Sequence, residues 1–157
     1  MKRVLITGMS GTGKSTVIRE LARRGYKAID TGWNPAWEEP VPEPDGPGWV
    51  WREDRIDALL RREDADALFI AACVENQGTF YPRFDEIVVL TVCPDLTVER
   101  LANRSSNPYG KRRDELQQVL SFKQTVEPRL LRSATARIDT AMALEAVVAE
   151  VVALVAS

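Results

Sequence analysis

The chain has 157 residues, 45% of them hydrophobic and 28% charged, which fits one compact domain with its own core. Its 21 basic and 23 acidic residues give a net charge of −2, so no general attraction to nucleic acid or to an anionic membrane is expected. Histidine is absent, which excludes histidine-based triads, metal ligands and acid–base catalysis.

The cysteines and the apolar stretches of the chain argue against a disulfide-rich, zinc-binding, secreted or membrane protein. Cys73 and Cys93 are too few for a disulfide framework or a cysteine zinc site, and we expect them to be reduced and partly buried. No apolar stretch has the length or the flanks of a signal peptide or of a membrane span. We therefore predict a single cytoplasmic domain over residues 1–157, a monomer or homodimer, with no nucleic-acid or membrane partner.

The first third of the chain predicts strand, loop and helix in turn. Residues 2–7 (KRVLIT) are rich in branched aliphatic residues, as in a buried parallel strand. Residues 15–24 have helical spacing, and residues 26–30 (YKAID) predict a second strand that ends on Asp30. Residues 32–48 hold five prolines, so we predict a long loop without regular structure there.

The rest of the chain alternates between helical and strand patterns. The predicted elements are a helix at 51–64, strands at 67–74 and 86–93, a helix at 94–103, a break at 105–110, a helix at 114–133 bent or interrupted at Pro128, a strand at 136–140 and a helix at 143–156. This alternation indicates an α/β domain with a parallel sheet covered on both faces. Ligands in such folds lie beyond the carboxyl ends of the strands.

One motif carries specific chemistry. Gly8, Gly13, Lys14 and Ser15 satisfy G-x-x-x-x-G-K-[ST], and a predicted strand before and helix after supply the required context. In such a loop successive N–H groups converge on phosphate oxygens, helped by the positive end of the helix. The predicted nucleotide-binding residues are Gly8, Met9, Ser10, Gly11, Thr12, Gly13, Lys14, Ser15 and Thr16.

Three side chains of this loop have individual roles. Lys14 would reach the β- and γ-phosphates, Ser15 Oγ would ligate Mg²⁺, and Thr16 would contact the α-phosphate. ATP is the expected nucleotide, because the chain has no Asn-Lys-x-Asp reader for guanine. ABC and AAA+ ATPases are set aside, because they are larger and their signature elements are missing.

Size, a lone phosphate loop and an arginine-bearing segment after the fourth strand resemble the nucleoside monophosphate kinases and their relatives, the shikimate and gluconate kinases. The resemblance covers the whole chain in order. It implies a P-loop NTPase three-layer sandwich with five parallel strands in the order 2-3-1-4-5 and a short lid. It places an acceptor-side loop at about 31–52 and the lid at about 104–113.

Asp30, in IDTGW, stands where these kinases often end the second strand with Asp-x-Asp. The resemblance implies that it works on the metal or takes the proton of the acceptor hydroxyl, although Gly32 replaces the second aspartate. Its alternative is a strand-end aspartate that caps a turn. Because no Walker B carboxylate follows the third strand, the metal is assigned to Ser15 and Asp30.

The segment ERLANRSSNPYGKRRDEL resembles the mobile lid of these kinases. Five basic residues lie between positions 100 and 113 with no acidic residue among them. Arg104 is the predicted catalytic arginine and Arg100 the predicted adenine partner. A solvated basic face is the alternative, above all for residues 111–113.

All four tryptophans bracket the proline-rich loop, where the kinase relatives close over their acceptor. Tryptophan offers a rigid surface on which a ring can stack, and arginine can bind an anionic group of the acceptor. The alternative for the tryptophans is that they only anchor the loop to the domain. The polar side chains at positions 76 and 77 could bind hydroxyls or amides of the acceptor, or could form a plain polar turn. The acidic residues of the loop favour a neutral or partly cationic hydroxylated acceptor. The predicted acceptor residues are Trp33, Trp51, Arg52, Arg55, Asn76 and Gln77.

These features together predict a kinase that uses ATP and Mg²⁺ to phosphorylate a small metabolite. A nucleoside monophosphate kinase is the alternative within the same class. A regulatory module that binds or slowly hydrolyses ATP without an acceptor is the alternative from another class. A nucleic-acid kinase is weakened by the acidic balance of the chain.

Overall fold

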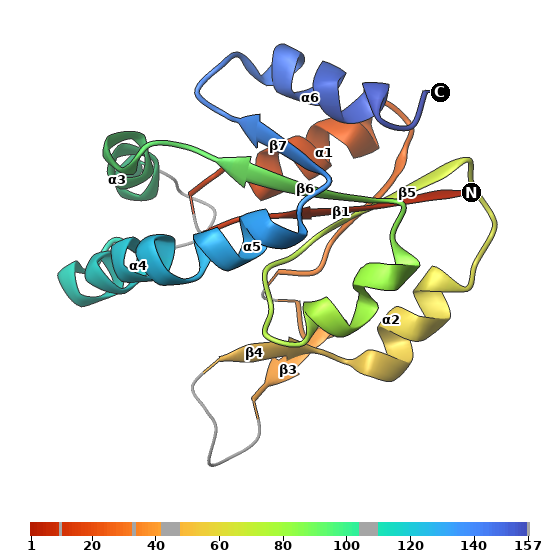
Figure 1. Cartoon of the computed structure of the whole chain (residues 1–157), viewed down its shortest axis with the longest axis horizontal. Coiled ribbons are helices and arrows are strands. Elements are labelled where there is room, and N and C mark those ends of the chain that lie inside the picture. Colours follow the sequence, from red (N-terminus) through yellow and green to blue (C-terminus); the bar gives the residue numbers. More distant parts are fainter. Residues whose placement is uncertain (10, 33, 42–47, 104–109, 157) are drawn as a thin grey trace.

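A computed structural model of the protein describes residues 1–9, 11–32, 34–41, 48–103 and 110–156. Its centre is a sheet of five parallel strands in the spatial order β2-β5-β1-β6-β7 (Figure 1). Counted along the chain within this sheet, the order is 2-3-1-4-5, which confirms the predicted arrangement. The strands are β1 (Lys2–Thr7), β2 (Lys27–Asp30), β5 (Ala67–Ala71), β6 (Glu86–Thr91) and β7 (Ala136–Asp139).

Two layers of helices cover the sheet, as predicted for a three-layer sandwich. α1 (Lys14–Arg23) and α6 (Leu144–Ala153) pack together on one face, against Val4 and Ile6 of β1 (Figure 1). α2 (Glu53–Leu60) and the 3₁₀ helix η1 (Gln77–Arg83) cover the other face, against Leu5. Successive residues of a strand point to opposite faces, so the branched aliphatic run of β1 is buried on both sides.

Three further helices follow β6. α3 (Pro94–Asn103) starts on proline as predicted, and α4 (Arg113–Thr125) is separated from α5 (Glu127–Ser133) at Val126. The predicted interruption therefore comes two residues before Pro128. Pro128 lies in the first turn of α5, where a missing N–H leaves no helical hydrogen bond unmade. No helix among the described residues is both long and apolar enough to cross a bilayer.

The predicted loop at 32–48 is wrong in part, because a short antiparallel hairpin lies there. β3 (Glu38–Pro40) pairs with β4 (Trp49–Trp51) (Figure 1). In the register of this pair Glu38 stands opposite Trp51. Pro40 is tolerated because it is the last residue of a short strand in a two-stranded sheet. The helix expected from residue 51 starts only at Glu53, since Trp51 belongs to the hairpin.

Trp51 ties this hairpin to the core. Its ring is 1% exposed and meets Phe80 edge to face at 5.6 Å, and its Nε1 donates to Thr31 Oγ1 at 2.9 Å. We expect Trp51→Ala to lower the free energy of unfolding by about 3–5 kcal/mol, measured by urea denaturation, because it leaves a large cavity. Trp49→Ala, at a half-buried ring of the same strand, is the matched control; an equal loss in both variants would contradict this role.

Candidate functional site

The phosphate loop joins β1 to α1 at the carboxyl edge of the sheet. Gly13 is the N-cap of α1 with φ 98°, a left-handed conformation that glycine adopts without strain. Glycine has no side chain to cap the helix, and the first turn holds no acidic residue, an arrangement in which helix N–H groups commonly bind an anion. A Cβ on Gly8 would lie 2.6 Å from Leu90 O, so only glycine fits there.

Lys14 curls back over the loop that precedes it. Its Nζ donates to Gly8 O at 2.6 Å and to Met9 O at 3.1 Å. Thr12 is buried and its Oγ1 donates to Met9 O at 2.8 Å, which closes the loop on itself. The ammonium group is thus held at the mouth of the loop, where phosphate oxygens would lie.

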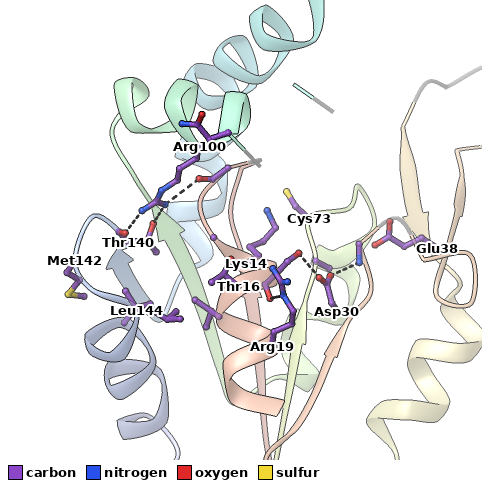
Figure 2. A pocket seen from close by; sticks show the side chains of 18 of the residues that line it. Lys14, Thr16, Arg19, Asp30, Glu38, Cys73, Arg100, Thr140, Met142 and Leu144 are labelled. Carbon is purple, nitrogen blue, oxygen red and sulfur yellow. Dashed lines mark hydrogen bonds between the residues drawn. The ribbon is translucent and has the colours of Figure 1, made fainter. Parts of the chain in front are cut away.

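A cavity of about 730 Å³ surrounds this loop and extends to both sides of it (Figure 2). In Figure 2, Thr140, Met142 and Leu144 lie on one side of Lys14, and Asp30 and Glu38 lie on the other. The cavity is therefore long enough to hold groups on both sides of a bound phosphate chain. Its lining residues include Gly11, Gly13, Lys14, Ser15, Thr16, Arg19, Asp30, Gly32, Glu38, Trp49, Ala72, Cys73, Arg100, Asn103, Thr140, Met142 and Leu144.

Ser15 and Asp30 meet in this cavity. Ser15 Oγ donates to Asp30 Oδ2 at 2.6 Å, although the two residues come from α1 and the end of β2. The other carboxylate oxygen, Oδ1, accepts from the Gly32 N–H at 3.0 Å, which fixes the carboxylate in place. The turn cap considered for Asp30 is thus observed, and it leaves the other carboxylate oxygen on Ser15 Oγ at the start of α1.

This pair also suits the hard cation that the motif implies. Mg²⁺ prefers oxygen ligands and is commonly held by one or two protein oxygens together with substrate phosphates. Over the described part of the chain, no cluster of three or more carboxylate or thiol side chains could hold a metal alone. Ser15 Oγ and Asp30 therefore fit a metal that is shared with the phosphates of a nucleotide.

Arg100 fixes the opposite side of the loop. Its NH1 donates to Thr140 Oγ1 at 2.8 Å and to Gly11 O at 3.4 Å, and its NH2 donates to Thr140 O at 2.5 Å. Thr140 Oγ1 in turn donates to Thr12 O at 2.7 Å. These bonds join α3, the phosphate loop and the segment after β7. Thr140 was not predicted, yet it follows a parallel strand at the edge where ligands bind.

We expect Thr140→Val to loosen this connection. The variant keeps the side-chain shape but removes the hydroxyl, so Thr12 O and Arg100 each lose a buried partner. The free energy of unfolding should fall by about 1–3 kcal/mol, and nucleotide affinity should weaken, as measured by calorimetry. Thr135→Val, at a hydroxyl that bonds β6 far from the loop, controls for the loss of a threonine hydroxyl. If Thr140→Val binds the nucleotide as tightly as the parent protein does, the role of Thr140 in positioning the loop is contradicted.

On the side of the cavity that holds Asp30, three further lining residues were not among the predicted site residues. Glu38 and Trp49 come from the hairpin, and Cys73 follows β5. Cys73 and Cys93 are both exposed, so the expectation of partly buried thiols is wrong; each lies beyond the end of its strand. The one local signal for β4 was its short run of aromatic and β-branched residues, WVW. A strand there requires a partner, and β3 is that partner.

Several predicted acceptor residues lie outside the cavity lining. The Trp51 ring is in the core, and Asn76 bonds the Trp51 backbone through its Oδ1 at 2.8 Å and its Nδ2 at 3.0 Å. Gln77 is buried, with its Nε2 donating to Thr7 Oγ1 at 3.1 Å. These side chains hold the hairpin and the end of β5 in place, so the structure gives them a supporting role, and contact with an acceptor stays a prediction.

The two predicted anion-gripping arginines also support the hairpin. Arg52 Nε donates to Pro35 O at 2.9 Å, and its NH1 pairs with Glu39 at 3.1 Å. Arg55 NH1 donates to Ala36 O at 2.8 Å. Neither lines the cavity, so in this structure both arginines serve the hairpin, and their acceptor role stays a prediction. Ser10, Trp33, Arg104 and most of the expected lid fall outside the described residues.

A phosphate loop followed by a helix, on a parallel sheet of order 2-3-1-4-5, defines a P-loop α/β protein. The sequence profile of the AAA domain family matches residues 4–121, and the chain belongs to this family. The match supports the predicted resemblance to P-loop small-molecule kinases. The matched range contains the phosphate loop and the first four strands of the sheet.

One curated relative shares part of the sequence. A nucleotide-binding protein of Granulibacter bethesdensis is 38% identical over 68 residues, which are 43% of this chain and 20% of that protein. The aligned stretch thus spans about one fifth of the length of that relative. The likeness is local and leaves the activity of the whole protein open to proposal.

Solved structures share the fold over nearly the whole chain. Shikimate kinase from Acinetobacter baumannii, in complex with shikimate, is 16% identical with a TM-score of 0.66, covering 99% of this chain and 93% of that one. A gluconokinase from Sinorhizobium meliloti 1021 is 21% identical, with a TM-score of 0.62 and coverages of 99% and 91%. Deoxyadenosine kinase from M. mycoides, with bound dATP, is 13% identical, with a TM-score of 0.60 and coverages of 100% and 100%. The predicted resemblance to small-molecule kinases is confirmed at the level of the fold.

Proposed function

We propose that the protein is an ATP-dependent kinase that transfers the γ-phosphoryl group to a hydroxyl of a small molecule. One observation carries the proposal: the phosphate loop, with Lys14 and the Ser15–Asp30 pair, lies in the middle of a cavity open to both sides. A site that only stores a nucleotide has no need of lined space beyond the last phosphate. The shared fold of the shikimate, gluconate and deoxyadenosine kinases supports the same proposal.

The nucleotide would enter from the side of Thr140. Its base would lie against Met142 and Leu144, near Arg100, and its phosphates would lie on the N–H groups from Gly8 to Thr16. Arg100 is held by Thr140 and Gly11, so its guanidinium is already fixed beside the base position. This ordering lowers the cost of binding, because the side chain loses little freedom on contact.

Phosphoryl transfer would take place beside Asp30. The acceptor oxygen forms a bond to the γ-phosphorus, the bond from that phosphorus to the β–γ bridging oxygen breaks, and ADP leaves. Asp30 is placed to take the proton of the acceptor hydroxyl, and Lys14 to stabilise the charge on the equatorial oxygens. Ser15 Oγ and the phosphates would hold Mg²⁺, which would neutralise the charge of the nucleotide. If Asp30 completes this metal site instead of acting as the base, the acceptor proton would pass to water.

ADP release from ATP tests this proposal. The protein is incubated with ATP and Mg²⁺, alone and with pools of sugars and polyols, amino sugars and amino alcohols, hydroxy acids, and nucleoside monophosphates. Acceleration by one pool, with a product heavier by one phosphoryl group, would support a kinase. Acceleration by the nucleotide pool alone would identify a nucleoside monophosphate kinase instead. ATP binding with no acceleration by any pool would favour the regulatory module.

A further inference from the structure

α3 packs directly on the backbone of the phosphate loop. Thr97 and Leu101 of this helix are 1% and 0% exposed. A Cβ on Gly11 would lie 3.4 Å from Thr97 Cγ2 and 3.4 Å from Leu101 Cγ, so both side chains pack against the loop at this glycine. A Cβ on Gly13 would likewise lie 3.9 Å from Arg100 NH1. The position of α3 and the shape of the loop therefore depend on each other.

Thr140 connects Arg100 to the phosphate loop. Arg100 NH1 donates to Thr140 Oγ1 at 2.8 Å, so this hydroxyl directs its own proton to another acceptor (Figure 2). The nearer of its two acceptors is Thr12 O at 2.7 Å, while Thr91 O lies at 3.4 Å. Arg100 NH2 donates to Thr140 O, which holds the same residue by its backbone. The guanidinium thus determines where the Thr140 hydroxyl points, and the hydroxyl holds Thr12 O.

Thr12 O and the Gly13 N–H belong to the same peptide unit. In a trans peptide the carbonyl and the N–H point in opposite directions, so a bond that fixes Thr12 O also fixes the direction of the Gly13 N–H. Gly13 is the N-cap of α1, where N–H groups converge on a bound phosphate. Arg100 NH1 also holds the preceding carbonyl, Gly11 O, more weakly at 3.4 Å. Arg100 and Thr140 therefore orient a donor of the nucleotide site.

The charge of Arg100 acts in the same direction. Its hydrogen bonds go to carbonyl and hydroxyl oxygens, and it forms no ion pair with any residue that the structure describes. The guanidinium is thus a cation beside the phosphate loop that no described carboxylate pairs with. Such a charge favours a triphosphate whatever base the triphosphate carries.

We propose that Arg100 is a positioning residue of the phosphate loop. It acts through Thr140 on the peptide between Thr12 and Gly13, and so strengthens the binding of the triphosphate itself, independently of the base. The resemblance to kinases implies a contact between Arg100 and adenine, but such a contact leaves its three hydrogen bonds to Gly11 and Thr140 unexplained. The inference rests on the proposed function for its ligand, ATP, and does not depend on the acceptor.

The test compares a triphosphate with a base and one without. The dissociation constants of ATP and of inorganic tripolyphosphate, both with Mg²⁺, are measured by calorimetry on the parent protein and on Arg100→Met. We expect the variant to bind both ligands more weakly by the same factor, roughly 10- to 100-fold, because it loses charged hydrogen bonds that hold the loop. Arg129→Met, at an exposed arginine of α5 outside the cavity lining, is the matched control and should change both constants less than about twofold.

A double-mutant cycle tests the connection through Thr140. Thr140→Val removes the hydroxyl and keeps the arginine, so it should also weaken the binding of both ligands by one common factor. Because Arg100 acts through that hydroxyl, the loss in the double variant should be smaller than the product of the two single losses. A loss equal to that product would mean that the two residues act independently and would overturn the inference. Thr140→Val keeps the inference testable if Arg100→Met does not fold.

The outcomes separate this inference from the proposed function. Weaker binding of ATP with unchanged binding of tripolyphosphate would mean that Arg100 acts on the base, and would overturn the inference. Unchanged constants for both ligands in Arg100→Met would mean that Arg100 serves only the fold, and would overturn it as well. A parent protein that binds ATP but no tripolyphosphate would do the same. A parent protein that binds no ATP would instead overturn the proposed function itself.

Discussion

Lys14→Ala is expected to lower kcat for phosphoryl transfer by about 10²–10³-fold, the usual cost of removing one group that stabilises transition-state charge. The Lys14 ammonium lies at the mouth of the phosphate loop, 2.6 Å from Gly8 O, where it would meet the transferred group. No other lysine lines the cavity among the described residues, and the two lining arginines, Arg19 and Arg100, bond Ser15 O and Thr140. The kcat of both proteins is measured from steady-state ADP release with an acceptor that the parent protein phosphorylates.

Lys2→Ala is the matched control for this variant. Lys2 begins β1, at the end of the strand away from the phosphate loop, and lies outside the cavity lining. Its removal should leave kcat within about twofold of the parent, as expected for a surface change. If circular dichroism shows that Lys14→Ala is folded and its kcat equals that of the parent, the proposed role of the loop is contradicted.

Asp30→Asn is expected to lower kcat by about 10²–10⁴-fold, the range for loss of a positioned general base. The amide keeps an oxygen for the Gly32 N–H but loses the negative charge that faces Ser15 Oγ. If the carboxylate acts through the metal, the variant should also need a higher Mg²⁺ concentration for half-maximal rate. A Mg²⁺ titration and a pH profile of kcat, run on both proteins, separate these two roles.

Asp139→Asn provides a close structural control. Asp139 also ends a parallel strand, and its Oδ1 accepts from the N–H two residues on, that of Ala141, at 2.9 Å. The same bond in Asp30 reaches Gly32 at 3.0 Å. Because Asp139 does not line the cavity, its variant should keep the parental rate. Equal losses in both variants would mean that Asp30 acts only as a turn cap.

The sheet and the phosphate loop could be predicted because their signals are local. The branched aliphatic run before Gly8 predicts a buried strand by itself, and the spacing of Gly8, Gly13, Lys14 and Ser15 predicts an anion site at a helix start. Each parallel strand is followed by a helix or polar segment, so the alternation also predicts the layers. Asp30 was assigned from the resemblance to kinases that end the second strand with Asp-x-Asp, and the structure places it at the carboxyl edge of the sheet, bonded to Ser15.

The acceptor side could not be predicted in the same way. β3 and β4 pair across a proline-rich segment, and that pairing determines that Trp51 is buried while Trp49 lines the cavity. Glu38 reads as one of several loop acids in the sequence, and only its place opposite Trp51 turns it inward. Arg52 and Arg55 were assigned to an anion on the acceptor, but in the structure their side chains donate hydrogen bonds to the backbone carbonyl groups of Pro35 and Ala36.

The central claim, that the loop transfers phosphate rather than only holding it, is tested most directly with ATP labelled by ¹⁸O on its γ-phosphoryl group. The labelled nucleotide and Mg²⁺ are incubated with each acceptor pool in turn, with the parent protein and with Lys14→Ala, and the masses of the products are measured by mass spectrometry. Our account predicts labelled phosphoryl on an acceptor hydroxyl in the parent reaction and its loss in the variant. Label found only in inorganic phosphate, with every acceptor pool unmodified, would contradict it.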